Sequence, residues 1–403
     1  MSRTVSVWVT SGADRLGVVG PFPVDVPWWA EVEPVVAHIR RTLGVDVLVL
    51  RLLRVEGGEG GRDGHATYHA EALRHSGSPA PLPADQTPLD DEQELRAPWA
   101  TIDGLREALS WASDALTAAG RPMSGPVEQR RTWNLAGLFR LPTDRGPVWL
   151  KTTPRFATDE AAVIGAFAGQ SQDLVPAVIA AATGRVLLEH VPGEDCWDAP
   201  DEIIAGAVTR LVAAQAALAG EVPAGVPDRR GPVLAARVHD LLDGDVGRAL
   251  TSEELADAYE LVERWPLLDG CGLPDTLVHG DFHPGNCRSD GGPPVLVDFA
   301  DAHLGNPVLD GVRICDFLPE ARRPAAARAW IGAWTAHAPG SDPARALTIA
   351  EPLAHLAYAV RYQEFLDGIE PSEHVYHLDD PVSSVRAALR ACSSPEQKLA
   401  VRG

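Results

Sequence analysis

Two carboxylates and one amide follow one another at short spacing within residues 277–311, which read LVHGDFHPGNCRSDGGPPVLVDFADAHLGNPVLDG. Asp281 lies in a sharp turn after an apolar run, Asn286 comes five positions later, and Asp298 ends the short apolar run Val295–Val297. One carboxylate of such a set can accept the proton of an attacking hydroxyl. An amide oxygen and a second carboxylate are ligands that suit Mg²⁺ on nucleotide phosphates. The spacing therefore predicts phosphoryl transfer.

The motif HGDxxxxN, followed by an apolar strand and Asp-Phe, resembles the catalytic loop and metal-binding segment of the aminoglycoside phosphotransferase family. That family is related to the protein kinases, whose motifs are HRDxxxxN and DFG. The resemblance implies that Asp281 is the catalytic base and that Asn286 and Asp298 bind Mg²⁺. A lone HGD is often only a turn, because Gly and Asp favour turns. Here the family's later GxPxxD also matches and is expected to anchor the loop, with its residues at Gly305, Pro307 and Asp310.

Lysine occurs at only two positions, Lys151 and Lys398. Lys151 ends an apolar strand, and a lysine offers the compact charge that suits the α- and β-phosphates. Thr158 is expected to cap the helix that follows. In the family resemblance, Glu160 pairs with Lys151, although Asp159 competes for that role. Acids are favoured in a first helical turn whatever their function.

The strand that ends near Glu189 resembles the hinge between the two lobes of a kinase. Backbone groups of Glu189, His190 and Val191 are expected there to bind the nucleotide base. Backbone recognition leaves no side-chain pattern that distinguishes the nucleotide bases. The resemblance implies ATP as the donor, with GTP left open.

The resemblance to the aminoglycoside phosphotransferase family implies an α+β chain with a bilobal, protein-kinase-like fold. A small β-rich N-lobe is expected over residues 125–192 and a helical C-lobe with the catalytic loop over residues 193–395. The predicted N-lobe strands are 128–134, 138–141 and 147–151, and the predicted helices of the C-lobe include 201–219, 252–265, 324–337 and 343–366.

A small α+β domain is expected over residues 1–120, with strands at 5–9, 45–55 and 65–70, helices at 29–43 and 102–119, and a loop at 76–88. Its helix–strand–strand order faintly resembles the later part of a Nudix fold. The Nudix metal cluster is missing, because Glu31 and Glu33 alone do not rebuild it. A structural or substrate-capping role is therefore expected for this domain rather than hydrolysis.

The 403 residues carry a formal net charge of −21, which argues against nucleic acid or an anionic membrane as partner. The five cysteines lack CxxC pairs, and no apolar run reaches the length of a spanning helix, so a cytoplasmic protein without disulfides is predicted.

His279 and His283 lack a third nearby ligand for a zinc site. We expect His279 to form hydrogen bonds within the loop. Oligomeric state is not predicted.

The segment from residue 364 to residue 380 holds six acids and no lysine or arginine. A solvated face is the commoner explanation of such clustering. The alternative is a wall of carboxylates that binds a cationic acceptor, formed by Glu364, Asp367, Glu370 and Glu373.

The predicted function is transfer of the γ-phosphate to a hydroxyl of a small molecule, for which an aminoglycoside or related antibiotic is one candidate. Choline-, homoserine- or sugar-type kinase activity is the main alternative acceptor chemistry, and a nucleotide-binding module without turnover is the other. The motifs specify phosphoryl transfer better than they specify the acceptor, so antibiotic resistance does not follow from them.

Overall fold

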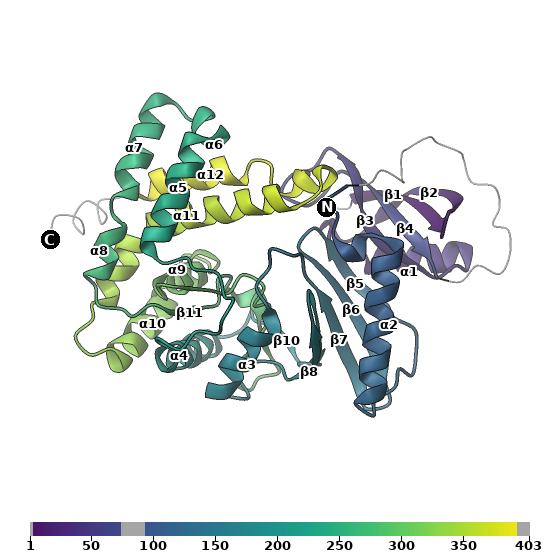
Figure 1. Ribbon diagram of the computed structural model, residues 1–403, viewed down its shortest axis with the longest axis horizontal. Helices are drawn as coiled ribbons and strands as arrows, with labels where there is room; N and C mark the ends of the chain where they lie inside the picture. The colour runs from purple at the N-terminus through teal and green to yellow at the C-terminus, as the bar shows by residue number, and fades with distance from the viewer. Residues whose placement is uncertain (1–2, 74–92, 393–403) are drawn as a thin grey trace. The chain divides into compact units, whose positions relative to one another are not determined.

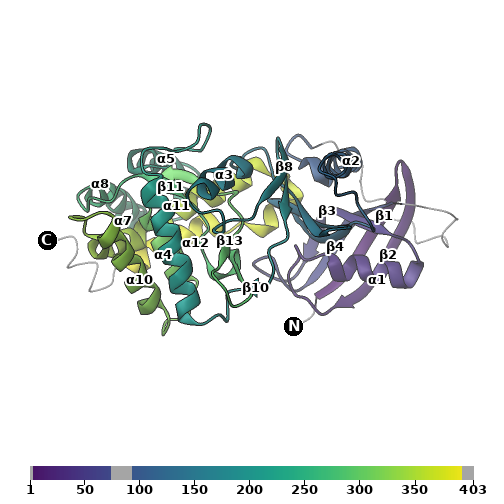
Figure 2. The same ribbon diagram turned by 90° about the horizontal axis from the view of Figure 1, so that it is seen from below.

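The computed structural model describes residues 3–73 and 93–392, so the predicted loop at 76–88 lies outside the described residues. The chain forms two compact units (Figures 1 and 2). Unit 1 comprises Met1–Phe156, Ile179–His190 and Phe365–Leu378, and unit 2 comprises Ala157–Val178, Val191–Glu364 and Asp379–Gly403. The chain changes unit between His190 and Val191, two residues before the predicted lobe boundary at 192. The predicted boundary at 120 does not separate two units, because residues on both sides of it belong to unit 1.

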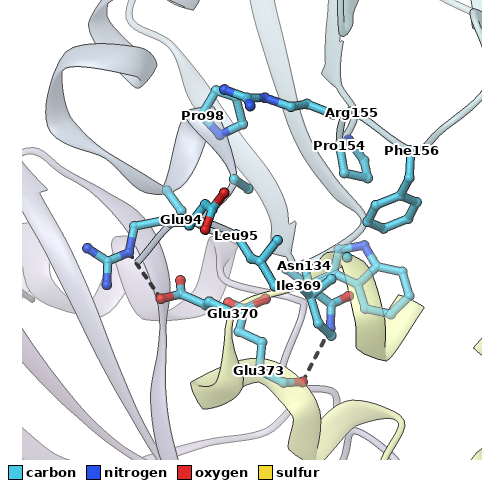
Figure 3. Close-up of a pocket in the computed structure, with 15 residues that line it drawn as sticks. Glu94, Leu95, Pro98, Asn134, Pro154, Arg155, Phe156, Ile369, Glu370 and Glu373 are labelled. Atoms are coloured by element: carbon cyan, nitrogen blue, oxygen red, sulfur yellow. Dashed lines mark hydrogen bonds and ion pairs between the residues drawn. The ribbon is translucent and has the colours of Figure 1, made fainter. Parts of the chain in front are cut away.

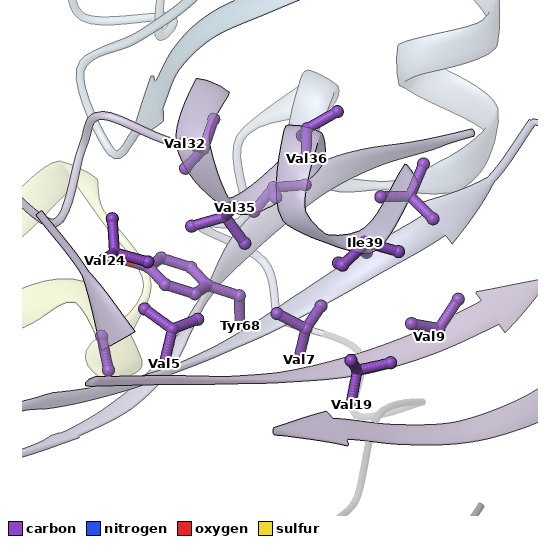
Figure 4. Packing of buried hydrophobic residues seen from close by; sticks show 14 of the residues in the cluster. Val5, Val7, Val9, Val19, Val24, Val32, Val35, Val36, Ile39 and Tyr68 are labelled. Carbon is purple, nitrogen blue, oxygen red and sulfur yellow. The ribbon is translucent and has the colours of Figure 1, made fainter. Parts of the chain in front are cut away.

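The first sheet of unit 1 has the strand order β2-β1-β4-β3, with β1 and β4 parallel and the other pairs antiparallel. Its elements are β1 (Arg3–Ser11), β2 (Asp14–Val24), α1 (Glu33–Leu43), β3 (Val47–Glu56) and β4 (His65–Ala72). Valines alternate along β1, so Val5, Val7 and Val9 share one face. Figure 4 shows that face packed against α1, with Val35 and Ile39 pointing onto it. Strand β2 was missed because its Gly and Pro residues hide the alternation, which an edge strand tolerates.

The second sheet of unit 1 has the order β5-β6-β7-β9-β8, and α2 runs alongside it in Figure 1. Its elements are η1 (Pro98–Ala100), α2 (Ile102–Ala118), β5 (Glu128–Trp133), β6 (Ala136–Thr143), β7 (Gly146–Thr152), β8 (Val178–Ala182) and β9 (Arg185–Glu189). Phe139, Val148 and Leu150 are buried in one core with residues of α2. Because side chains alternate along a strand, Lys151 points to the opposite face from Leu150.

Unit 2 is mainly helical, and its short strands form the sheet β10-β12-β13 and the pair β11-β14. These strands are β10 (Glu194–Asp195), β11 (Thr276–Val278), β12 (Cys287–Ser289), β13 (Val295–Leu296) and β14 (His303–Gly305). The helices are α3 (Glu160–Gln170), α4 (Asp201–Ala217), α5 (Gly231–Asp243), α6 (Asp245–Arg248), α7 (Ser252–Val262), α8 (Trp265–Asp269), η2 (Pro284–Asn286), α9 (Val308–Asp316), α10 (Arg323–His337) and α12 (Asp380–Cys392). Helix α11 (Pro343–Gly368) begins in unit 2 and ends in unit 1, where η3 (Pro371–Tyr376) follows it.

Helix η3 buries a carboxyl group in unit 1. Glu373 is 4% exposed, and its Oε1 accepts a hydrogen bond from the Leu52 N–H at 3.3 Å. Burial, assisted by the nearby charge of Glu370, raises the pKa of Glu373 to about 8 from its ordinary value of 4.5. The native state therefore keeps a proton that the unfolded chain releases above pH 4.5. Stability from this group is present below that pH and is lost as pH rises toward 8.

We expect Glu373→Gln to make stability less sensitive to pH between 4.5 and 8, because the amide keeps the side chain's shape and cannot ionise. The substitution should reduce the dependence of the free energy of unfolding on pH by at most ~1.4 kcal/mol per pH unit. Urea midpoints at pH 5.5 and pH 8 measure it. Glu94→Gln, a change at an exposed carboxylate of the same unit, is the matched control. Equal pH dependence of the Glu373→Gln variant and the wild type would contradict this account of Glu373.

Candidate functional site

Asp310 anchors the loop that carries Asp281. Its Oδ2 accepts hydrogen bonds from the His279 N–H at 2.8 Å and from Gln215 Nε2 at 2.7 Å, and its Oδ1 accepts one from the Gly280 N–H at 3.0 Å. Burial raises the pKa of the Asp310 carboxyl, and these donors act against that rise. The expectation that the GxPxxD aspartate anchors the loop is therefore confirmed.

We expect Asp310→Ala to lower the melting temperature and turnover together, because it leaves the N–H groups of His279 and Gly280 without their acceptor. Each unsatisfied buried group costs ~1–3 kcal/mol, so a loss of several degrees follows. Differential scanning calorimetry and an ADP-release assay measure the two effects. Asp257→Ala, on the exposed side of α7, is the control. A variant that melts like the wild type would show that the anchor is dispensable.

The glycine of the HGD motif is required by the backbone. Gly280 has a φ of +87°, and a Cβ added to it would lie 2.1 Å from the carbonyl oxygen of Asp301. His279 accepts a hydrogen bond from the Asp281 N–H at Nδ1 and lies 3.2 Å from the carbonyl oxygen of Val297 at Nε2. Since Nδ1 accepts, Nε2 carries the proton and donates to Val297. His279 thus forms hydrogen bonds within the loop, as expected.

Asp281 is held by donors on both carboxylate oxygens. Oδ1 accepts from Arg313 Nε at 2.9 Å and Nη2 at 2.7 Å, and Oδ2 accepts from Asn286 Nδ2 at 3.1 Å. His283 Nε2 lies 3.4 Å from Oδ2, and it carries the ring proton because Nδ1 accepts the Gly285 N–H. Burial alone would raise the pKa of Asp281, but Arg313 and His283 outweigh it and hold the pKa well below its usual range. The carboxylate is therefore ionised at neutral pH.

Asn286 and Asp298 fit the hard oxygen ligands that Mg²⁺ takes. The Asn286 Nδ2 group donates to the backbone oxygen and to Oδ2 of Asp281, which leaves the amide oxygen directed elsewhere. The next segment is tied to the same loop, because the Val297 N–H donates to the backbone oxygen of Asn286 at 2.9 Å. Asp298 has a φ of +68°, which few residues other than glycine adopt and which often marks functional positions. An amide oxygen and a carboxylate could thus hold Mg²⁺ together with nucleotide oxygens.

Glu160 is 4% exposed at the start of α3, and its Oε1 accepts the Phe299 N–H at 2.9 Å. It therefore holds the residue that follows Asp298. The expected helix cap was wrong: Asp159 accepts the Ala162 N–H, whereas the Thr158 hydroxyl donates to the Ala302 carbonyl at 2.6 Å. Asp159 is used by the cap, which leaves Glu160 as the acid turned toward this segment.

Three of the predicted nucleotide-binding residues, Lys151, Glu189 and His190, lie in unit 1, whereas Glu160 and Val191 lie in unit 2. Lys151 is 7% exposed on β7, between Leu138 of β6 and Val186 of β9. The side chain of Glu189 pairs with Arg121, and His190 Nδ1 accepts from Trp149 Nε1 at 3.0 Å. In unit 2, the Val191 carbonyl accepts from Arg288 Nε at 3.3 Å.

The four acids of the predicted carboxylate wall are divided between the two units. Glu364 belongs to unit 2, where it pairs with Arg229, Arg237 and Arg361. Asp367, Glu370 and Glu373 belong to unit 1, and of the four only Asp367 is exposed.

Two of these acids line a pocket of about 330 Å³ in unit 1. In Figure 3, Glu370 and Glu373 lie on its floor near Asn134, whose Nδ2 donates to the Glu373 backbone oxygen at 3.4 Å. Glu370 accepts from Arg51 and from Arg96, both at 3.0 Å. With Glu370 paired to two arginines and the pKa of Glu373 raised, the pocket does not present the pair of free carboxylates that the wall required.

The sequence interpretation missed Arg313, the principal partner of Asp281. A usable signal existed: Arg313 follows Asp310 by three residues in α9, and residues at that spacing share a helix face. Since Asp310 was expected to anchor the loop that carries Asp281, a residue on the same face of α9 could be expected to contact that loop as well.

Within residues 3–73 and 93–392, no cluster of three His, Cys, Asp or Glu side chains could bind a metal. None of the helices in the described part of the chain is long and apolar enough to cross a membrane.

The phosphotransferase enzyme family (APH) matches residues 138–347, more than half of this chain. The chain is similar to a choline/ethanolamine kinase family protein from Mesorhizobium loti, with a TM-score of 0.54 and 16% identity, over 73% of this chain and 98% of that one. It is also similar to a macrolide 2′-phosphotransferase from Brachybacterium faecium, with a TM-score of 0.50 and 18% identity, over 68% of this chain and 98% of that one. No match is found among curated proteins.

These similarities confirm the predicted α+β, protein-kinase-like fold, and the family match covers the loop with Asp281, Asn286 and Asp298. The chain therefore belongs to the phosphotransferase enzyme family.

Proposed function

We propose that this protein transfers the γ-phosphate of ATP to a hydroxyl group of a small molecule in the cytoplasm. The observation that carries the proposal is the state of Asp281, an ionised carboxylate that hydrogen bonds hold beside the amide of Asn286. The positive φ of Asp298 supports the same assignment.

Asp281 receives or orients the proton of the acceptor hydroxyl in this proposal. Its low pKa makes it a weak base, which suits phosphoryl transfer, because the transition state is loose and little proton transfer is needed early. Positioning of the hydroxyl then supplies most of the rate enhancement. Asn286 and Asp298 would hold Mg²⁺, which when bound neutralises charge on the transferred phosphoryl group.

Lys151 is proposed to contact the α- and β-phosphates, and Glu160 to orient the segment of Asp298. The backbone at Glu189, His190 and Val191 is proposed to bind the base, with ATP or GTP as donor. The Arg121–Glu189 and Trp149–His190 hydrogen bonds use side-chain atoms of Glu189 and His190, which is compatible with backbone recognition.

ADP and GDP release with Mg²⁺ tests the function, across a panel of aminoglycosides, other hydroxylated antibiotics, choline-like amines and sugars. Asp281→Ala provides the blank. Acceptor-dependent release that disappears in the blank supports the proposal and identifies the acceptor class. If nucleotide and Mg²⁺ raise the melting temperature but no acceptor, including water, is phosphorylated, the chain is a nucleotide-binding module and the proposal fails.

A further inference from the structure

Arg313 is fixed against Asp281 more firmly than a surface ion pair requires. Its side chain is 16% exposed, and both Nε and Nη2 donate to the same oxygen, Oδ1 of Asp281. Its guanidinium lies over the ring of Phe317 at 4.4 Å and over that of Tyr358 at 4.6 Å. Aromatic faces attract a cation and restrict its rotation, so the charge of Arg313 has a defined position.

Phe317, which contacts the guanidinium of Arg313, is also part of a stack of aromatic rings. The ring centroid of His283 lies 4.7 Å from that of Phe317 and 5.3 Å from that of Trp197, with interplanar angles of 21° and 24°. Trp197 and Phe317 are 39% and 37% exposed, so the outer side of the stack remains accessible. One oxygen of Asp281 is thus held by Arg313, and the other faces Asn286 and His283.

We infer that Arg313 is a positioning residue for Asp281 and that its fixed charge selects against acceptors with an ammonium group beside the hydroxyl to be phosphorylated. The inference rests on the proposed function. An acceptor hydroxyl that reaches Asp281 must come within a few ångströms of the guanidinium, whose repulsion of a second positive charge offsets the attraction that the Asp281 carboxylate would otherwise exert. The favoured acceptor is therefore neutral around its reacting hydroxyl, in contrast to the cationic acceptor suggested by the acidic composition.

The charges of neighbouring residues in unit 2 do not reverse this selection. Glu364 is matched by Arg229, Arg237 and Arg361, and Asp301 is matched by Arg361. Burial raises the pKa of Asp316 to about 6, so this carboxyl is still largely ionised at neutral pH, but the charges of Arg313 and Arg323 oppose its negative charge. Arg313 consequently remains the cation in direct contact with the proposed proton acceptor.

The first test compares wild type, Arg313→Met and Arg313→Lys in Mg·ATP hydrolysis, in which water is the acceptor. Arg386→Met, which breaks an arginine–carboxylate pair between α7 and α12, is the matched control. We expect Arg313→Met to lower kcat by ~10- to 100-fold with little change in the KM for Mg·ATP, because Asp281 loses its orientation but the nucleotide site does not change. Arg313→Lys should restore part of kcat. A kcat equal to that of Arg386→Met would overturn the positioning role.

The second test compares kcat/KM for matched acceptors, glucosamine against glucose and ethanolamine against ethylene glycol. The amine-to-neutral ratio should rise ~10-fold in Arg313→Met, because the repulsion is removed. A general structural defect would lower both members of a pair and leave the ratio unchanged, so an unchanged ratio overturns the selectivity. If the protein hydrolyses Mg·ATP but phosphorylates none of these acceptors, the kcat comparison of the first test decides whether Arg313 positions Asp281. A wild type without any turnover overturns the proposed function, and the inference falls with it.

Discussion

Asp281→Ala is expected to lower turnover by at least ~10³-fold while Mg·ATP binds as tightly as it does to the wild type. The carboxylate is the group that the surrounding donors orient, and its removal leaves the hydroxyl of the acceptor without its proton acceptor. Nucleotide affinity should persist because the proposed phosphate and metal contacts come from other residues. Single-turnover kinetics and isothermal titration with Mg·ATP measure the two quantities separately.

The alanine variant leaves Arg313 without its carboxylate, which could disturb the loop. Asp281→Asn keeps the shape of the side chain and is therefore measured beside it. Both variants should retain the wild-type melting temperature to within a few degrees if the loss is chemical. Activity of either variant equal to that of the wild type would contradict the role of Asp281.

Asp298→Asn is expected to abolish the part of nucleotide affinity that depends on Mg²⁺. The change removes one negative charge from the proposed metal site. Asparagine accepts a positive φ nearly as well as aspartate, so the backbone at +68° is kept. Asp298→Ala should lose the same affinity and in addition destabilise the fold by ~1–2 kcal/mol, since alanine is strained at this φ.

Nucleotide titrations with Mg²⁺ and with EDTA measure this effect. The wild type should bind more weakly in EDTA, and Asp298→Asn should bind with the same weak affinity in both. Asp63→Asn is the matched control, because Asp63 is the other non-glycine residue with positive φ among the described residues, at +63°. Mg²⁺-dependent binding retained by Asp298→Asn would exclude Asp298 as a metal ligand.

The strands and helices were predictable where one hydrophobic period dominates. Strand β1, with alternating valines, and helix α2, with apolar residues at helical spacing, were predicted close to their observed bounds. Strand β2 was not, because glycine and proline interrupt its pattern at the edge of the sheet.

The sequence by itself determined which residues form the loop that we propose to be catalytic. The order of Asp281, Asn286, Asp298 and Asp310 is local, and the turn that it requires depends on Gly280 and on nearby hydrogen bonds. Such short-range constraints leave a readable pattern, and the family match agrees with it.

Only the tertiary structure decided the electrostatic state of these groups. Glu364 and Glu370 look like free acids in the sequence, but arginines from distant positions pair with them. Arg313 is 32 residues from Asp281, yet it contacts that carboxylate and gives the site a fixed positive charge. Charge interactions depend on distance and burial in three dimensions, which composition does not contain, so the sequence showed these acids but not the arginines that pair with them.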